Sequence, residues 1–240
     1  MRRKAILLYH EDAGLMTGKD VNDMKTFLCS PFGGAWEPNE VDCRKNISLS
    51  GLQRLVCETK EQCYDYLVFY FSGHGGCARG DFLELNPTGE TVEVRELLAM
   101  STRQLSMFDC CRAYPVNEKM SFALDALNES HGVDRYRTIA REFYDERVSA
   151  ALQQSMVLYA CREGEYAHDF GRGGVYTQNL LDAARSFDGS VLLASQAHLM
   201  AYQPTVEEAL KHNGVQHPDL YMAKLPSRYQ LPFAINLNQI

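Results

Sequence analysis

The chain carries several short apolar runs, separated by longer segments of mixed polarity. The runs cover residues 5–9, 66–72, 104–109 and 156–160. They show little alternation of apolar and polar positions, a pattern typical of parallel strands that are buried on both faces. The sequence therefore predicts that these runs form a mainly parallel sheet.

The segments between the runs have the spacing of amphipathic helices. In the segment 20–28, Val21, Met24 and Leu28 fall on one helical face, and Asp20 is expected to cap the N-terminus of the helix. Further helices are predicted for residues 49–58, 136–153, 174–184 and 207–211.

The order of these elements indicates the fold class. A hairpin is expected over residues 81–97, around Gly89, and an edge strand is expected in the terminal PFAINL. Strands separated by helices predict an α/β fold with helices on both faces of the sheet. A length of 240 residues suits one domain over 1–240. In such sheets, functional groups collect just beyond the carboxyl ends of the strands.

Composition and charge exclude several classes of partner. The formal net charge is −7, and no cluster of Lys and Arg suits a nucleic acid. The N-terminal apolar run is shorter than the roughly 7–15 residues of a signal peptide. No stretch reaches the roughly 18 apolar residues of a membrane span. We therefore expect a cytoplasmic protein without a membrane or nucleic-acid partner, and the sequence carries no signal for an oligomeric state.

The eight cysteines do not follow the spacing of a metal site. No C-x-x-C pair occurs, and His74 and Cys77 lack a second pair of residues at zinc-ligand spacing. A disulfide framework belongs to small secreted chains. No metal and no cofactor are expected, and most of the thiols are expected to be small buried side chains.

Two of the predicted strands end in chemically reactive side chains. One stops in Ser72-Gly73-His74-Gly75-Gly76, and a later one stops in Asp109-Cys110-Cys111-Arg112. If the two strands are neighbours, an imidazole and a thiol meet at the same edge of the sheet.

This pair of groups suits nucleophilic catalysis. A free thiol has a pKa of about 8.5 and is largely protonated at neutral pH, and a neighbouring histidine can accept its proton. The glycines beside His74 allow close approach of a substrate and offer unobstructed N–H donors to an oxyanion. The alternatives are that His74 is an ordinary turn residue and that the cysteines are packed in the core.

The same residues resemble the motifs of a known family, the clan of caspases, metacaspases and bacterial caspase-like peptidases. Ser72-Gly73-His74-Gly75 resembles its S-G-H-G motif, and Asp109-Cys110-Cys111-Arg112 resembles its D-x-C-[HR] motif. The segments TGKDVNDMKTFL and MVLYACREGEYAHDFGRGGVYTQNLL resemble the family's first helix and small-subunit region. The resemblance extends over residues 3–190 and implies a caspase-like three-layer sandwich.

The resemblance implies a role for each motif residue. Cys111 would be the nucleophile, and His74 would be the base that later protonates the leaving amine. The N–H groups of Gly75 and Cys111 would form the oxyanion hole, and Cys110 would be a packed neighbour. Arg112 would be a structural residue. The implied activity is that of a cysteine endopeptidase acting on a protein or peptide substrate.

The resemblance also suggests where specificity lies. In metacaspase-like members, an acidic pocket corresponds to Asp109, Ser72 and Asp20 of this chain. Carboxylates favour Arg or Lys through charge-assisted hydrogen bonds, so cleavage after a basic residue is expected. Two alternatives stay open. Asp109 could simply brace a turn or cap a backbone, or the pocket could take an uncharged residue, as it does in some bacterial members.

The family pattern divides the domain into parts. Residues 1–113 would correspond to the large subunit, 114–153 to a linker and helix, and 154–240 to the small subunit and a C-terminal tail. Arg135 ends the expected linker 114–135 and Arg137 lies just past it, which would suit self-cleavage, although an ordinary surface loop is the alternative. No dense acidic cluster suggests calcium binding.

Other functional classes share part of this pattern. A catalytically silent caspase-like adaptor is the main alternative, although such members usually lose the His or the Cys. A cysteine enzyme of another reaction type would share the dyad but not both motifs. By analogy with bacterial caspase-like peptidases, the expected role is regulated cell death or antiphage defence, with a pore-forming effector as an example of a substrate.

Overall fold

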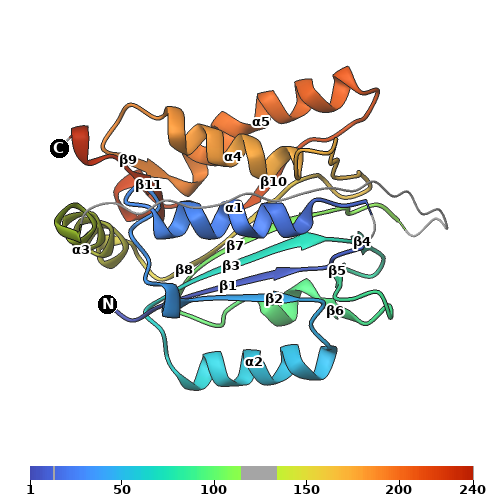
Figure 1. Ribbon diagram of the computed structural model, residues 1–240, viewed down its shortest axis with the longest axis horizontal. Helices are drawn as coiled ribbons and strands as arrows, with labels where there is room; N and C mark the ends of the chain where they lie inside the picture. Colours follow the sequence, from blue (N-terminus) through green and yellow to red (C-terminus); the bar gives the residue numbers. More distant parts are fainter. Residues whose placement is uncertain (13, 115–133, 240) are drawn as a thin grey trace.

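The computed structural model describes residues 1–12, 14–114 and 134–239. Within these ranges, six strands form the central sheet in the order β10-β8-β7-β3-β1-β2 (Figure 1). They are β1 (Arg3–Tyr9), β2 (Val41–Lys45), β3 (Tyr66–Gly73), β7 (Arg103–Cys110), β8 (Gln154–Tyr159) and β10 (Asp219–Tyr221). Only β10 is antiparallel to its neighbour. The prediction of a mainly parallel sheet is confirmed.

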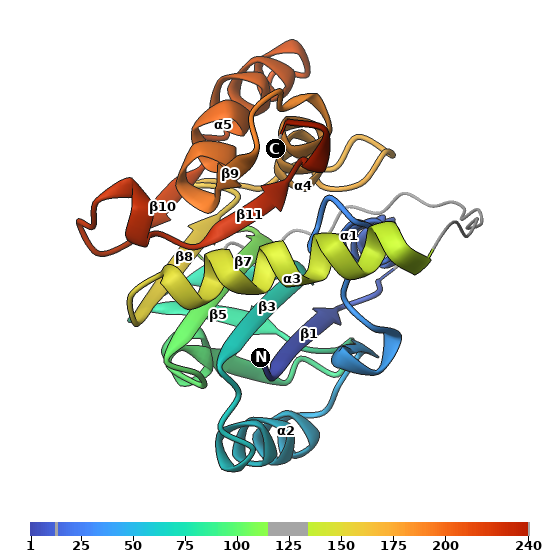
Figure 2. The ribbon, with the colours of Figure 1, turned by 90° about the vertical axis from the view of Figure 1, so that its left-hand side faces the viewer.

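Helices cover both faces of the sheet, as the α/β prediction requires (Figure 1). The helices are α1 (Thr17–Cys29), α2 (Leu49–Glu61), α3 (Asp134–Ala150), α4 (Val175–Ser186) and α5 (Ala194–Lys211). Helix α2 lies on one face, whereas α1, α4 and α5 lie on the other. Helix α3 crosses the sheet near the starts of its strands (Figure 2), where Asp145 pairs with Arg3. No helix in the described ranges is both long and apolar enough to cross a membrane.

The alternation of side chains along each strand produces two separate cores. In β1, Ile6 and Leu8 belong to the core under α2, whereas Ala5 and Leu7 belong to the core under α1 and α4. Both sets are fully buried. This two-sided burial explains why the central strands appear in the sequence as continuous apolar runs.

Two small sheets flank the central one. One has the order β4-β5-β6, and the other pairs β9 with β11. Their bounds are β4 (Gly75–Cys77), β5 (Asp81–Glu84), β6 (Thr91–Glu93), β9 (Val191–Leu193) and β11 (Pro232–Ile235). The expected hairpin is therefore present, although residues 94–97 form a short 3-10 turn instead of continuing the strand. The strand expected in PFAINL is β11, outside the central sheet.

Two helix predictions were wrong in detail. Helix α1 begins at Thr17 with Met16 at the N-cap position, so Asp20 is not the cap and its carboxylate is free to serve elsewhere. Helix α5 has 18 residues and continues through Pro204, whereas only its last turn was predicted. Thr205 donates its hydroxyl proton to the carbonyl of Ala201 beside this proline, and Ala201 is fully buried. Packing against the core offsets the cost of a proline within the helix.

Candidate active site

The two reactive motifs lie at adjacent strand ends. Strands β3 and β7 are parallel neighbours, with Ser72 opposite Asp109 and Gly73 opposite Cys110. Each strand ends at that second pair. His74 directly follows β3 and Cys111 directly follows β7, so both residues lie at the carboxyl edge of the sheet.

The alternation along these strands sorts the motif residues between the two faces. Cys110 is buried in the core under α2. Asp109 and Ser72 point to the opposite face, where Thr177 of α4 and Asp20 of α1 contact them. The prediction that Cys110 is a packed neighbour agrees with this burial.

Gly75 sits where only a glycine fits. A Cβ added there would lie 2.9 Å from Cys110 Sγ and 3.0 Å from the carbonyl oxygen of Cys111. Just beyond, the N–H of Cys77 donates to the carbonyl of Ala113 at 3.1 Å. The hairpin of β4 and β5 is therefore held directly against the chain that carries Cys111. Strand β4, which makes this contact, was not predicted.

The thiol of Cys111 is half-buried and partly engaged. Its Sγ donates to the carbonyl of Ala167 at 3.7 Å. Burial raises the pKa of this thiol. The resting group is accordingly a neutral thiol, which must lose its proton before it can attack a carbonyl carbon.

His74 is surrounded by groups that were not anticipated from the sequence. Its Nε2 lies 3.5 Å from Oδ2 of Asp12, in the loop after β1. The ring of His10 stands edge-on to it, with the centroids 5.0 Å apart. His10 is buried, and its Nδ1 lies 3.1 Å from the carbonyl oxygen of Glu84. Burial lowers the pKa of His10, and so does the proximity of His74. Because β1 neighbours β3, its carboxyl end could have been searched for such groups.

The three residues expected to form an acidic pocket do come together. The hydroxyl of Ser72 donates to Asp20 Oδ2 at 2.9 Å. Asp109 Oδ2 accepts the N–H of Thr177 at 3.0 Å and its hydroxyl at 2.6 Å. The N–H of Gly174 donates to Asp20. Both carboxylates thus receive N–H groups from the N-terminus of α4, which favours negative charge there. One oxygen of Asp109, Oδ2, therefore caps the backbone of α4 at Thr177, which is the capping role considered as an alternative for this residue.

The two carboxyl groups are nevertheless in a poor environment for charge. Burial raises the pKa of Asp20 to about 8, and the neighbouring charge of Asp109 adds to the effect. Burial also raises the pKa of Asp109, to about 6, against the hydrogen bonds from Thr177. A third carboxylate, Asp169, raises both. In the described part of the chain, the bonds to Asp20 and Asp109 come from neutral donors only.

A glycine turn covers this acidic pair. Asp20 is 1% exposed and Asp109 is 5% exposed. A Cβ on Gly173 would lie 2.3 Å from Asp20 Oδ1, and one on Gly174 would lie 2.2 Å from Asp109 Oδ2. The turn is held by Asp169, whose Oδ1 accepts the N–H groups of Gly171 and Gly173. The glycines of this turn belong to a segment that the sequence analysis matched to the family, whereas Asp169 was not singled out.

Arg112 braces the edge of the site. Its guanidinium makes two hydrogen bonds of 2.9 Å to the carboxylate of Asp81 in β5 and stacks over Tyr159, 4.1 Å from the ring centroid. The arginine is 4% exposed. It therefore ties the chain after Cys111 to the hairpin after His74, in keeping with the expected structural role.

The expected linker 114–135 lies almost wholly outside the described residues. Arg135 and Arg137, considered as self-cleavage positions, lie in α3. The guanidinium of Arg137 donates to the carbonyl oxygens of Cys29 at 2.6 Å and Trp36 at 3.3 Å. Arg137 is thus a packing residue in this conformation.

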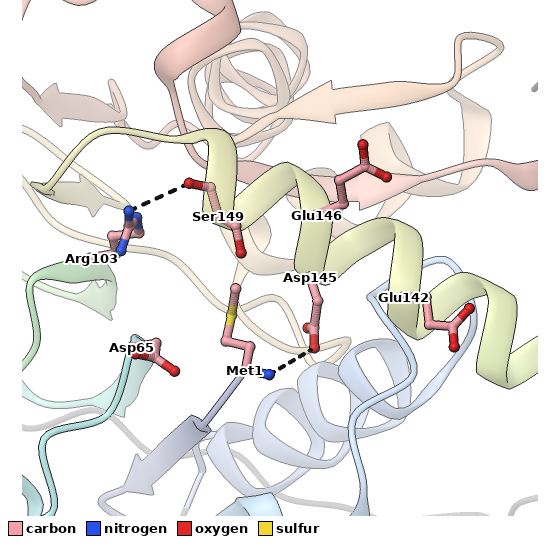
Figure 3. Close-up of a pocket in the computed structure, with 7 residues that line it drawn as sticks. All are labelled: Met1, Asp65, Arg103, Glu142, Asp145, Glu146 and Ser149. Carbon is pink, nitrogen blue, oxygen red and sulfur yellow. Dashed lines mark hydrogen bonds and ion pairs between the residues drawn. The ribbon is translucent and has the colours of Figure 1, made fainter.

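A surface cavity of about 520 Å³ lies at the other end of the sheet. Figure 3 shows its lining of Met1, Asp65, Arg103, Glu142, Asp145, Glu146 and Ser149. These residues precede or begin a strand or belong to α3, whereas His74 and Cys111 follow the strands. The cavity is therefore separate from the candidate active site.

Comparison with known proteins agrees with this geometry. The caspase domain family matches residues 2–230. No curated protein matches the chain. Among solved structures, caspase-1 from Spodoptera frugiperda is similar, with a TM-score of 0.62 and 14% sequence identity over 92% of this chain and 86% of that one. That likeness shows a shared fold, whereas the family match extends over nearly the whole sequence. The chain belongs to the caspase domain family of cysteine peptidases, as the resemblance of its motifs predicted.

Proposed function

We propose that this protein is a cysteine endopeptidase that uses His74 and Cys111 as a catalytic dyad. The observation that carries the proposal is the pairing of Gly73 with Cys110 in neighbouring parallel strands. This register supports a thiol and an imidazole emerging side by side at the carboxyl edge of the sheet, where α/β proteins place their chemistry.

The proposed reaction follows from the groups at that edge. Cys111 Sγ attacks the carbonyl carbon of the scissile bond while His74 accepts the thiol proton. The N–H groups of Gly75 and Cys111 donate to the oxyanion as the C–S bond forms. His74 then gives its proton to the leaving amine as the C–N bond breaks. Water, deprotonated by His74, then hydrolyses the thioester. This step releases the acid product and restores the free thiol of Cys111.

We further propose cleavage after Arg or Lys. Asp20 and Asp109 place two buried carboxyl groups beside the nucleophile strand, with Asp169 nearby. A guanidinium or ammonium group would supply the positive charge that these acids lack, and an Arg could bind a carboxylate through two hydrogen bonds.

Substrate entry requires the glycine turn to move. Gly173 and Gly174 lie against the two carboxylates, and Ala167 lies on the thiol. A basic side chain reaches the acids only when this segment shifts outward. The described conformation therefore corresponds to a resting state, and a slow step before the first turnover is expected.

A peptidyl-arginine chloromethyl ketone tests the dyad and the pocket together. The wild type is expected to be alkylated at Cys111, and Cys111→Ala and His74→Ala should not react. A set of fluorogenic peptides that differ only in the residue before the cut should give the highest kcat/KM for Arg and Lys. Asp109→Asn should flatten that preference. An unchanged preference would reduce Asp109 to a cap on α4.

The covered thiol also favours a second candidate, a catalytically silent adaptor. In that case the contact between Cys111 Sγ and the Ala167 carbonyl would be permanent. The chloromethyl ketone separates the two functions, because a silent domain would leave Cys111 unlabelled at every probe concentration while remaining folded.

A cytoplasmic role in regulated cell death or antiphage defence is proposed by family analogy alone. The substrate would be a protein, such as a pore-forming effector encoded beside this chain. Co-expression with neighbouring gene products, followed by N-terminal sequencing of fragments, would identify it. Fragments that also form with Cys111→Ala would count against the role.

A further inference from the structure

The surroundings of His74 contain a carboxylate that the dyad does not require. Asp12 Oδ2 lies 3.5 Å from His74 Nε2, and the two side chains are 41% and 35% exposed. Asp12 follows β1, whose register with β3 places Tyr9 opposite Ser72. The chain just past β1 therefore runs beside the chain that carries His74.

The loop that carries Asp12 is anchored on both sides. The N–H of Glu11 donates to the side chain of Asn46 at 2.8 Å. The N–H of Leu15 donates to the carbonyl of Asp12 at 3.3 Å, and the hydroxyl of Thr17 donates to the carbonyl of His10 at 3.0 Å. These bonds hold the backbone of Asp12 near the imidazole.

A histidine can face two partners at once, one through each ring nitrogen. A carboxylate beside Nε2 favours the tautomer that carries its proton there. That tautomer leaves Nδ1 bare and able to accept a proton from a thiol. The same negative charge stabilises the imidazolium that forms when the proton arrives.

The other groups around His74 add little competing charge. His10 is held neutral by burial, and its Nδ1 is engaged by the carbonyl of Glu84. The backbone of Glu84 also contacts this strand end, since its N–H donates to the carbonyl of His74 at 3.0 Å. Glu84 Oε1 lies 4.0 Å from His10 Nδ1. Asp12 is thus the carboxylate next to the ring of His74 among the described residues.

We propose that Asp12 is a positioning residue, which orients His74 through Nε2 and stabilises its protonated form while Cys111 reacts. This inference rests on the proposed dyad and adds a third member to it. Asp12 touches neither the substrate nor the thiol, so its effect should appear in the rate of the chemical step.

Asp12→Asn tests the proposal, with Asp12→Glu as the conservative variant. Glu11→Gln is the matched control, because it removes a charge from the same loop but from a side chain that pairs with Lys45. Asp12→Asn should lower kcat roughly 10- to 100-fold with little change in KM, less than the ~10⁴-fold of a buried triad aspartate because solvent screens the charge. The acidic limb of the kcat/KM profile should move to lower pH, and Asp12→Glu should restore part of the loss.

The pH dependence of Cys111 alkylation by iodoacetamide provides a readout that needs no peptide substrate. Mass spectrometry of the Cys111 peptide distinguishes it from the exposed cysteines Cys43, Cys57 and Cys63. Asp12→Asn should slow alkylation near neutral pH roughly tenfold, because fewer imidazolium–thiolate pairs form. If the wild type cleaves no peptide but shows this difference, the peptidase proposal fails and the role of Asp12 stands. Equal alkylation and kcat profiles for wild type, Asp12→Asn and Glu11→Gln would overturn the proposed role of Asp12.

Discussion

The backbone N–H of Gly174 lies 3.0 Å from both carboxylate oxygens of Asp20. Gly174 has a φ of −56°, a value open to any residue, so its identity is not required by the backbone conformation. The requirement comes from its neighbour, since a Cβ here would lie 2.2 Å from Asp109 Oδ2. Glycine is therefore required at position 174 by the contact with the acidic pair and not by the backbone conformation.

Gly174→Ala should accordingly damage the pocket. The added methyl group would push Asp109 away from Thr177, and we expect KM for Arg substrates to rise roughly tenfold with a smaller effect on kcat. Gly18→Ala in α1 is the control, because its Cβ would meet its nearest neighbour at an ordinary 3.5 Å. Steady-state kinetics on an Arg peptide checks this. A loss of thermal stability without any change in KM would assign Asp109 to bracing α4.

The buried acids should make the stability of the fold depend on pH. Because the pKa values of Asp20 and Asp109 are raised on folding, the folded state binds more protons than the unfolded chain. Their contribution is fully present below the unfolded pKa of about 3.9 and is lost as pH rises through about 6 to 8. The Tm of the wild type should fall over this range, and Asp20→Asn should flatten the fall. Asp182→Asn, on an exposed side chain, should leave the slope unchanged.

That experiment compares slopes, so a uniform loss of stability in Asp20→Asn does not obscure it. Differential scanning fluorimetry at several pH values is sufficient. A slope identical to that of the wild type would show that the two carboxyl groups titrate as ordinary exposed acids.

Gly75→Ala should separate the two halves of the dyad. The methyl group would clash with Cys110 Sγ at 2.9 Å and with the carbonyl oxygens of Phe82 at 2.9 Å and Cys111 at 3.0 Å. A shift of this size between reacting groups is expected to lower kcat roughly 100-fold. Gly80→Ala lies in the turn of the same hairpin, with nothing within 4 Å of its Cβ, and should retain wild-type activity. Retained activity in both variants would mean that the hairpin tolerates displacement.

Removing the brace at Arg112 should cost stability. Arg112→Ala leaves the carboxylate of Asp81 without its bidentate partner, and we expect the free energy of unfolding to fall by about 3 kcal/mol. Arg95→Ala provides the comparison, because its pair with Glu93 is exposed and should contribute less than about 1 kcal/mol. Urea denaturation measures both. Similar losses in the two variants would contradict a special role for Arg112.

The central strands and the fold class were predictable because burial on both faces leaves an unmistakable apolar run. Two outer strands of the central sheet, β2 and β10, were not. Strand β2, with the sequence VDCRK, has only its first residue buried, and β10 is three residues long at the edge of the sheet. Such strands owe their conformation to a neighbour's backbone, a signal that no local pattern carries.

The residues of the candidate site also differ in whether a local sequence pattern reveals them. His74 and Cys111 stand in local motifs, so they could be found in the sequence alone. Asp12, His10 and Asp169 reach the site from loops distant along the chain, and only the tertiary fold brings them there. Asp20 was picked out by motif but given the wrong helical position, because its carboxylate serves another helix instead of its own.

The order of the strands determines whether the two pieces of a chain cut between Cys111 and α3 stay together. Strand β8 follows such a cut yet pairs along its whole length with β7, which precedes it. Arg141 adds a clamp through its ion pair with Glu40, and Arg137 through the carbonyls of Cys29 and Trp36. A nicked molecule would therefore elute from a sizing column as a single particle and come apart only in detergent.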